Sequence, residues 1–112
     1  SGANLTPSQA RVIFTIGGTE GMTCKDIGDA TLITKGTLTG VIDRLEEKGL
    51  VERWAVEGDG RKTIIALTRR GERVYQSEFP KHVDFLKEKF DGLSARDRKQ
   101  AISLLGKIKA LF

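Results

Sequence analysis

The residues that most often carry enzyme chemistry are scarce in this chain of 112 residues, which contains one cysteine and one histidine. A single cysteine excludes an internal disulfide, and one cysteine with one histidine excludes a zinc finger. No glycine-rich phosphate loop follows a predicted strand either, so these residues leave no catalytic constellation from which an enzyme could be built. The sequence therefore predicts a protein that is not an enzyme and that uses no cofactor or metal.

The remaining candidate chemistry lies in residues 34–71, where small, hydroxyl-bearing and basic residues cluster. Free N–H groups and the helix dipole at the start of a helix suit phosphates. Two glycines on an exposed helix face cost about 1 kcal/mol each relative to alanine, so either another molecule comes close there or they are tolerated surface residues. The polar face of the predicted helix carries Lys35, Gly36, Thr39, Gly40 and Asp43.

A β-hairpin is predicted directly after this helix, with a polar tip at residues 57–62 that contains Arg61. Such a helix can enter the major groove of DNA while the hairpin reaches the neighbouring minor groove. The segment therefore predicts a winged helix-turn-helix.

Two helices are expected ahead of this segment, and each begins with a threonine that can cap it. Thr6 with Pro7 and Gln9 forms a capping box that opens the first helix, which Gly17-Gly18 ends with a left-handed turn. Thr23 and Asp26 repeat the device. The second helix is short, since its apolar face consists of Ile27, Ala30 and Leu32.

Thr34 is expected to cap the third helix, which ends at Gly49. Its buried stripe follows the helical spacing i, i+3, i+4 and i+7, with Leu38, Val41, Ile42 and Leu45. Residues 50–56 and 63–67 are rich in β-branched side chains and predict the two strands of the wing. Trp54 in the first strand either covers the open face of the sheet or stacks on a sugar.

Two C-terminal helices complete the predicted fold. The first covers residues 68–90, and Pro80 is expected to kink it or to break it after Glu78 or Phe79. The second begins near Ser94 and carries a wide apolar stripe to the last residue, which requires a partner surface. The predicted fold class is mainly α (α+β), a winged helix-turn-helix with a two-stranded wing and two C-terminal helices for dimerisation.

Composition agrees with one soluble domain, with 38% hydrophobic residues, 30% charged residues and a net charge of +4. No apolar run approaches the roughly 20 residues of a membrane span, and the single cysteine fits a reducing cytoplasm. We expect residues 1–4 to be a tag remnant or a disordered start, residues 5–71 to form the DNA-binding domain, and residues 72–112 to form the dimerisation helices.

Three segments of the chain resemble the MarR family of bacterial transcriptional regulators. Asp59-Gly60-Arg61, followed after five residues by Leu67-Thr68 and after two more by Gly71, is similar to the family's wing motif. Leu5-Thr6 with Gln9 resembles the start of the family's second helix. The end of the family's recognition helix and its first wing strand are resembled by Ile42-Asp43-Arg44-Leu45 and Lys48-Gly49-Leu50-Val51-Glu52-Arg53.

The resemblance implies a homodimer that binds a pseudo-palindromic DNA operator, usually as a repressor, and that responds to a small-molecule effector. Residues 34–44 would lie in the major groove, and Arg61 is similar to the family's minor-groove arginine. Asp59 and Gly60 would shape the wing tip, and Asp43 resembles a family acid that pairs with wing arginines, which predicts an Asp43–Arg61 contact. Family members usually have a further helix ahead of the segment that opens at Leu5. Only four residues precede Leu5 here, so we expect that helix to be missing from this chain.

Combining the polar face, the wing and the basic residues beside it gives a set of expected DNA contacts. These are Thr34, Lys35, Gly36, Thr37, Thr39, Gly40, Arg44, Arg61, Lys62, Arg69 and Arg70, with Asp43, Asp59 and Gly60 as residues that structure the wing. The alternative is a winged helix that has lost DNA binding and serves protein interaction. Cys24 at a helix start is either an oxidation sensor or an inert small residue.

Overall fold

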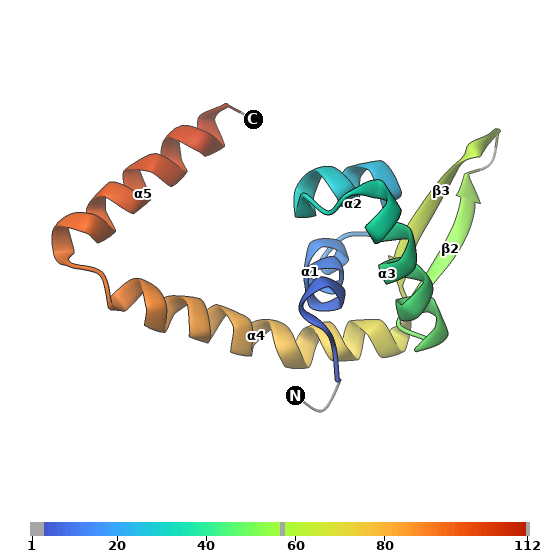
Figure 1. The fold of residues 1–112 in the computed structure, drawn as a ribbon, viewed down its shortest axis with the longest axis horizontal. Coiled ribbons are helices and arrows are strands. Elements are labelled where there is room, and N and C mark those ends of the chain that lie inside the picture. Colours follow the sequence, from blue (N-terminus) through green and yellow to red (C-terminus); the bar gives the residue numbers. More distant parts are fainter. Residues whose placement is uncertain (1–3, 57, 112) are drawn as a thin grey trace. The chain divides into compact units, whose positions relative to one another are not determined.

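The computed structural model describes residues 4–56 and 58–111, and the side chains of residues 59–61, 105, 108 and 109 lie outside the description. The chain divides into two compact units, Ser1–Phe79 and Pro80–Phe112. The first unit holds a winged helix-turn-helix, as predicted (Figure 1). The elements are α1 (Pro7–Ile16), β1 (Met22–Thr23), α2 (Cys24–Thr31), α3 (Lys35–Glu47), β2 (Val51–Val56), β3 (Asp59–Leu67), α4 (Arg69–Asp91) and α5 (Ala95–Ala110).

Helix α1 begins with the predicted capping box. The Thr6 hydroxyl accepts from the Gln9 backbone N–H at 3.2 Å, and the Gln9 side chain accepts from the Thr6 N–H at 3.3 Å. Gly17 ends the helix, and Gly18 takes the left-handed conformation at φ +79°. Gly17 also lies against α4, because a Cβ at this position would be 2.2 Å from the ring of Tyr75.

Helix α2 begins as predicted, with the Thr23 hydroxyl accepting from the Asp26 N–H at 3.1 Å. Its predicted apolar face is wrong in two positions. Ala30 is exposed, and Leu32 has 88% of its surface exposed. Leu32 terminates the helix at φ +60°, and this left-handed conformation takes its side chain off the face that Ile27 and the buried Thr31 share.

Helix α3 buries the predicted stripe, with Leu38, Ile42 and Leu45 in the core and Val41 half-buried. Thr34 occupies the N-cap position as predicted, but its hydroxyl donates to the Thr37 hydroxyl at 3.2 Å and makes no side-chain capping bond. The C-terminal end is closed by two backbone bonds. Gly49 at φ +73° donates to Glu46, and Leu50 donates to Leu45, both at 2.9 Å.

The wing is the antiparallel hairpin of β2 and β3, which projects from the helices in Figure 1. Two features differ from the expectation. Strand β1 was not predicted, and it adds a third strand by pairing Met22 with Ile65 and Thr23 with Ile64. Strand β3 begins at Asp59 rather than residue 63, because the polar residues continue the ladder past a bulge between Ala55 and Val56.

One apolar cluster holds the first unit together. It joins α1, α2, α3 and the base of the wing, so the orientation of α3 is fixed by residues outside the segment that carries it. The buried members are Val12, Ile13, Ile16, Ile27, Leu38, Ile42, Leu45, Leu50, Val51 and Ile65.

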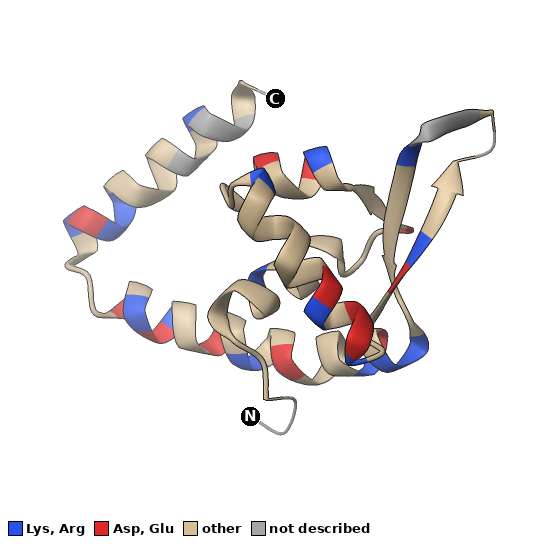
Figure 2. Cartoon of the chain, turned by 45° about the vertical axis from the view of Figure 1, so that its right-hand side comes forward, with Lys and Arg blue, Asp and Glu red and all other residues tan. Residues whose placement is uncertain are grey.

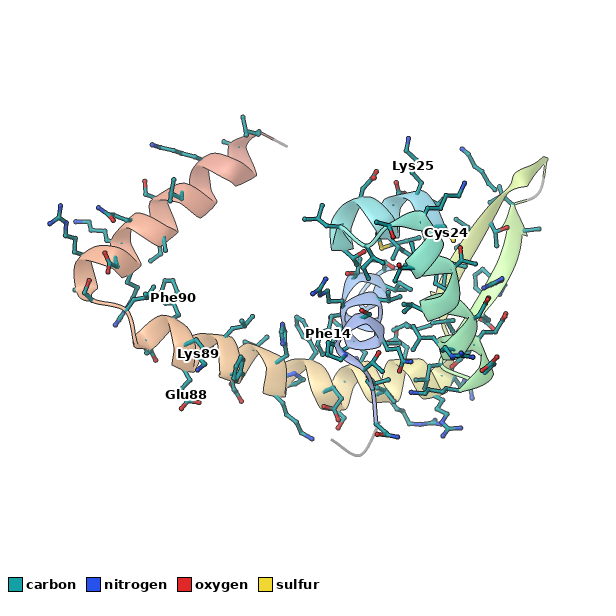
Figure 3. All side chains as sticks on the ribbon, viewed as in Figure 1. Phe14, Cys24, Lys25, Glu88, Lys89 and Phe90 are labelled. Atoms are coloured by element: carbon teal, nitrogen blue, oxygen red, sulfur yellow. The ribbon has the colours of Figure 1, made fainter. Side chains whose placement is uncertain are left out.

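The first half of α4 packs on α1 through aromatic rings. The rings of Phe14 and Phe79 meet edge to face at 5.6 Å between centroids, and Tyr75 stacks on Phe79 at 5.0 Å. Figure 3 shows Phe14 on the side of α1 that faces α4. Helix α4 continues through Pro80, so the predicted break after Glu78 or Phe79 is wrong.

The second unit consists of the rest of α4 and α5. Arg98 ties the turn between them, donating to the carbonyl oxygens of Asp91 and Leu93, each at 3.3 Å. Its guanidinium also lies 6.0 Å from the centre of the Phe90 ring. Large apolar side chains of this unit are exposed in the single chain, namely Phe85, Leu86, Leu93, Ile102, Leu104 and Leu111.

Candidate nucleic-acid interface

The exposed face of α3 is made of small and hydroxyl-bearing residues. A Cβ added to Gly36 or Gly40 would meet no atom within 4 Å, so packing within the chain does not require glycine at either position. The Thr39 hydroxyl donates to the Lys35 carbonyl oxygen at 3.0 Å and stays on the helix surface. The predicted members of this face are all exposed, namely Thr34, Lys35, Gly36, Thr37, Thr39 and Gly40.

Charge is unevenly distributed along α3. Lys35 is the first charged residue of the helix and the next is Asp43, so the N-terminal half carries a positive charge and no acid. Figure 2 shows the acidic positions of α3 gathered in its C-terminal half. The half of the helix that carries the free N–H groups and the positive dipole end is therefore also the half without carboxylates.

Arg53 of β2 pairs with the acids of α3, a contact that was not predicted. Its guanidinium donates to the Asp43 carboxylate, and its Nε lies 3.7 Å from the Glu46 carboxylate. One signal could have found it. Val51 faces the core, and strand alternation places Arg53 on the same side of β2, toward α3.

The predicted Asp43–Arg61 contact stays a prediction, because the side chain of Arg61 lies outside the described residues. The side chain of Asp59 lies outside them too, and for Gly60 the structure gives the backbone within β3. Lys62 on the same strand is exposed. Trp54 lies opposite Ile64 in the hairpin and is 52% exposed, so its ring remains available on the wing.

The end of the wing is locked to the end of α3 by Thr68 and Gly71. The Thr68 hydroxyl donates to the Gly49 carbonyl oxygen at 2.6 Å and accepts from the Gly71 N–H at 3.1 Å. A Cβ at Gly71 would lie 2.0 Å from the Leu50 carbonyl oxygen. The Leu-Thr-x-x-Gly motif thus brings the start of α4 against the base of the wing, where the adjacent Arg69 and Arg70 are exposed.

Arg44 is exposed on α3 and pairs with Glu47 at 3.6 Å, with side chains 69% and 66% exposed. A pair this exposed contributes little to folding, so Arg44 can exchange its partner for another anion at small cost.

A cavity of about 530 Å³ opens between α2 and α3. It brings the predicted contacts Lys35 and Thr39 together with the exposed thiol of Cys24 and with Lys25, both labelled at the start of α2 in Figure 3. The rest of its lining is Gly28, Asp29, Ile33 and Leu38.

The described residues offer neither a metal site nor a membrane-spanning helix. They contain no group of three or more histidine, cysteine or acidic residues placed to hold a metal ion. No helix within the same part of the chain has the length and apolar character to cross a membrane.

Comparison with known proteins gives a consistent family. The model of the MarR family matches residues 3–62. The chain is 33% identical over 91 residues to the HTH-type transcriptional regulator FarR of Neisseria gonorrhoeae, covering 81% of this chain and 60% of FarR. It is 31% identical over 106 residues to the transcriptional regulator HosA of Escherichia coli O157:H7, covering 94% of this chain and 78% of HosA.

Solved structures agree with the sequence relatives. The structure of Bordetella bronchiseptica BpsR, whose DNA binding is regulated by 6-hydroxynicotinic acid, has a TM-score of 0.76 and 26% identity. That likeness covers 96% of this chain and 76% of BpsR. The family model spans more than half of the sequence, and HosA is more than 30% identical over most of its own length, so the chain belongs to the MarR family.

Proposed function

We propose that this chain is a sequence-specific DNA-binding transcriptional regulator that acts as a repressor. The observation that carries the proposal is the open face of α3, where Gly36 and Gly40 leave room that no atom of the chain fills. A duplex that approached this face could bring base edges and phosphates next to the backbone of α3. The relatives FarR and HosA are both transcriptional regulators.

In this proposal α3 is the recognition helix and lies in the major groove. Lys35 and the N–H groups of the first turn bind phosphate, and Thr37 and Thr39 offer hydroxyls to base edges. Arg61 enters the adjacent minor groove, with Asp59 and Gly60 shaping the tip. Lys62, Arg69, Arg70 and Arg44 bind the phosphates that flank these grooves.

A homodimer would present two such heads to a pseudo-palindromic operator. The apolar side chains exposed on the second unit, such as Leu86, Ile102 and Leu104, require a partner surface, and a second copy through residues 72–112 supplies a matching one. Half-sites in such complexes lie about 34–36 Å apart. An effector that changed the spacing of the two recognition helices by a few ångströms would cause the dimer to release the operator. In this proposal the protein acts in the bacterial cytoplasm.

One structural neighbour supports an effector in the proposal. DNA binding by BpsR is regulated by 6-hydroxynicotinic acid. The chain spans 60% of the length of FarR. A response of this chain to an effector is therefore part of the proposal.

Selection of bound duplexes from a random pool tests the proposal directly. We expect enrichment of a palindromic sequence, bound with an affinity that falls steeply as salt rises, because each phosphate contact releases counterions. Failure to shift any duplex at low salt would refute DNA binding and leave the interaction module as the better description. Enrichment of a single half-site would refute the dimer alone.

A further inference from the structure

Lys48 closes the C-terminal end of α3 and binds residues at the start of α1. Its Nζ donates to the Gln9 side-chain oxygen at 2.6 Å and to the Asn4 carbonyl oxygen at 3.0 Å. Lys48 is half-buried, and Gln9 is buried with 6% of its surface exposed. The ammonium therefore lies against the start of α1.

Gln9 joins two structural tasks at one oxygen atom. The same Oε1 that accepts from Lys48 accepts from the Thr6 N–H in the capping box of α1. Asn4 contributes its carbonyl from a left-handed conformation at φ +51°, which a residue other than glycine adopts uncommonly. The segment that leads into α1, the first turn of α1 and the last turn of α3 consequently share one hydrogen-bonded cluster.

The positive charge of Lys48 favours its contacts at the C-terminal end of α3 over a contact with a DNA phosphate. A cation at the C-terminal end of a helix interacts favourably with the helix dipole, and hydrogen bonds from a charged donor are stronger than neutral ones. Two of the three ammonium donors are used within the chain. The polar face of α3 lies in its N-terminal half, so Lys48 sits at the far end of a helix of 13 residues.

We propose that Lys48 is a positioning residue for DNA binding, which holds the recognition helix at a fixed angle to α1 through Gln9 and Asn4. A helix of this length spans about 20 Å, so a small rotation at its held end displaces the residues that meet DNA at the other end. A displacement of the segment that leads into α1 then reaches the recognition helix through the same cluster. The inference rests on the proposed DNA binding.

The test measures binding of a labelled duplex, selected from a random pool by the wild-type chain, to Lys48→Met, Gln9→Met and the double variant. We expect each single variant to weaken binding about fivefold to tenfold, and the double variant to be no weaker than the worse single one, because both remove the same tie. Gln9→Glu keeps an oxygen that can accept from Lys48 and from the Thr6 N–H, so this variant should bind the duplex with wild-type affinity. Losses that multiply in the double variant, or a Gln9→Glu variant as weak as Gln9→Met, would overturn the proposal.

Salt dependence separates positioning from direct contact. Lys62→Met is the matched control, a lysine proposed to bind phosphate, and it should reduce the slope of log affinity against log salt by about one. Lys48→Met should leave that slope unchanged, and a reduction equal to that of the control would instead make Lys48 a phosphate contact. Gln9→Met changes no charge, so it tests the same tie if Lys48→Met fails to fold. If the wild type binds and the variants bind with the same affinity, this inference alone is overturned. If the wild type does not bind, the proposed function is overturned as well.

Discussion

Arg53 on β2 and Asp43 on α3 form an ion pair that joins the wing to the helix proposed to read DNA. The same guanidinium lies near Glu46, so one arginine balances two acids on α3. Without this pairing, the two carboxylates would leave unbalanced negative charge on the helix proposed to read DNA. The pair thus connects the geometry of the wing with the electrostatics of the recognition helix.

Replacing Arg53 with glutamine should weaken DNA binding and should change the stability of the fold little. The paired side chains are 37%, 50% and 46% exposed, so the loss of unfolding free energy should stay below about 1 kcal/mol. Two unpaired carboxylates beside the duplex should reduce affinity about fivefold by repulsion. Urea unfolding and fluorescence anisotropy measure the two effects. Adding Asp43→Asn should recover part of the affinity, and an unchanged affinity in Arg53→Gln would contradict this account.

Gly40→Ala should stabilise the protein while weakening DNA binding. Alanine is favoured over glycine within a helix by about 0.5–1 kcal/mol, and the added methyl meets no atom of the chain. If a duplex approaches the helix backbone closely, the methyl should reduce affinity about tenfold by a clash of the kind that costs 1–3 kcal/mol. Gly106→Ala on α5 is the matched control, since its added methyl also meets open space. It should stabilise the protein equally, and an affinity of Gly40→Ala equal to that of the wild type would argue against close approach.

Gly71→Ala should destabilise the chain by about 2–3 kcal/mol, since overpacking against backbone forces the structure to shift. The added Cβ would lie 2.0 Å from the Leu50 carbonyl oxygen, which has no rotamer with which to move away. The midpoint of urea unfolding measures the change. Gly106→Ala again provides the control, and similar midpoints for the two variants would show that α4 can withdraw from the wing at little cost.

Leu32→Asn should stabilise the chain by about 0.5–1 kcal/mol, because asparagine tolerates the left-handed conformation that costs leucine of order 1–2 kcal/mol. Leu32 is 88% exposed at φ +60°, so the change removes almost no buried surface. Thermal unfolding should show the gain. Leu32→Ala keeps the unfavourable conformation and should not show it, so an equal gain in both variants would point to the exposed apolar surface instead.

Arg61→Ala should weaken duplex binding by about 1–3 kcal/mol if the arginine reads the minor groove. The loss should be larger for the selected duplex than for a random one, because a groove contact depends on DNA shape whereas a phosphate contact does not. Anisotropy titrations with both duplexes measure the difference. Equal losses on both would reassign Arg61 to the phosphates.

The parts of the fold that could be predicted depend on residues close in sequence. The capping boxes at Thr6 and Thr23 join residues three positions apart, and the stripe of α3 follows from helical spacing. These patterns are visible in the sequence because the interacting groups share one element.

Two of the features that were missed join residues far apart in the chain, and a third is a single backbone angle. Strand β1 has two residues and is defined by its pairing with Ile64 and Ile65, so no local pattern announces it. Lys48 meets Gln9 across 39 positions, and Leu32 leaves its predicted face through a single backbone angle. Pairing of this kind is fixed by the assembled core and is absent from the periodicity of either segment.

The ring of Tyr75 fills the space that a side chain at position 17 would need. A Cβ at residue 17 would lie 2.2 Å from the Tyr75 ring, so a larger residue at position 17 requires the ring to move or to be replaced. A relative that carries a larger residue at the position of Gly17 must carry a smaller one in place of Tyr75, or hold α4 farther from α1. Covariation between these two positions would therefore record how closely the long helix is seated on the DNA-binding unit in each lineage.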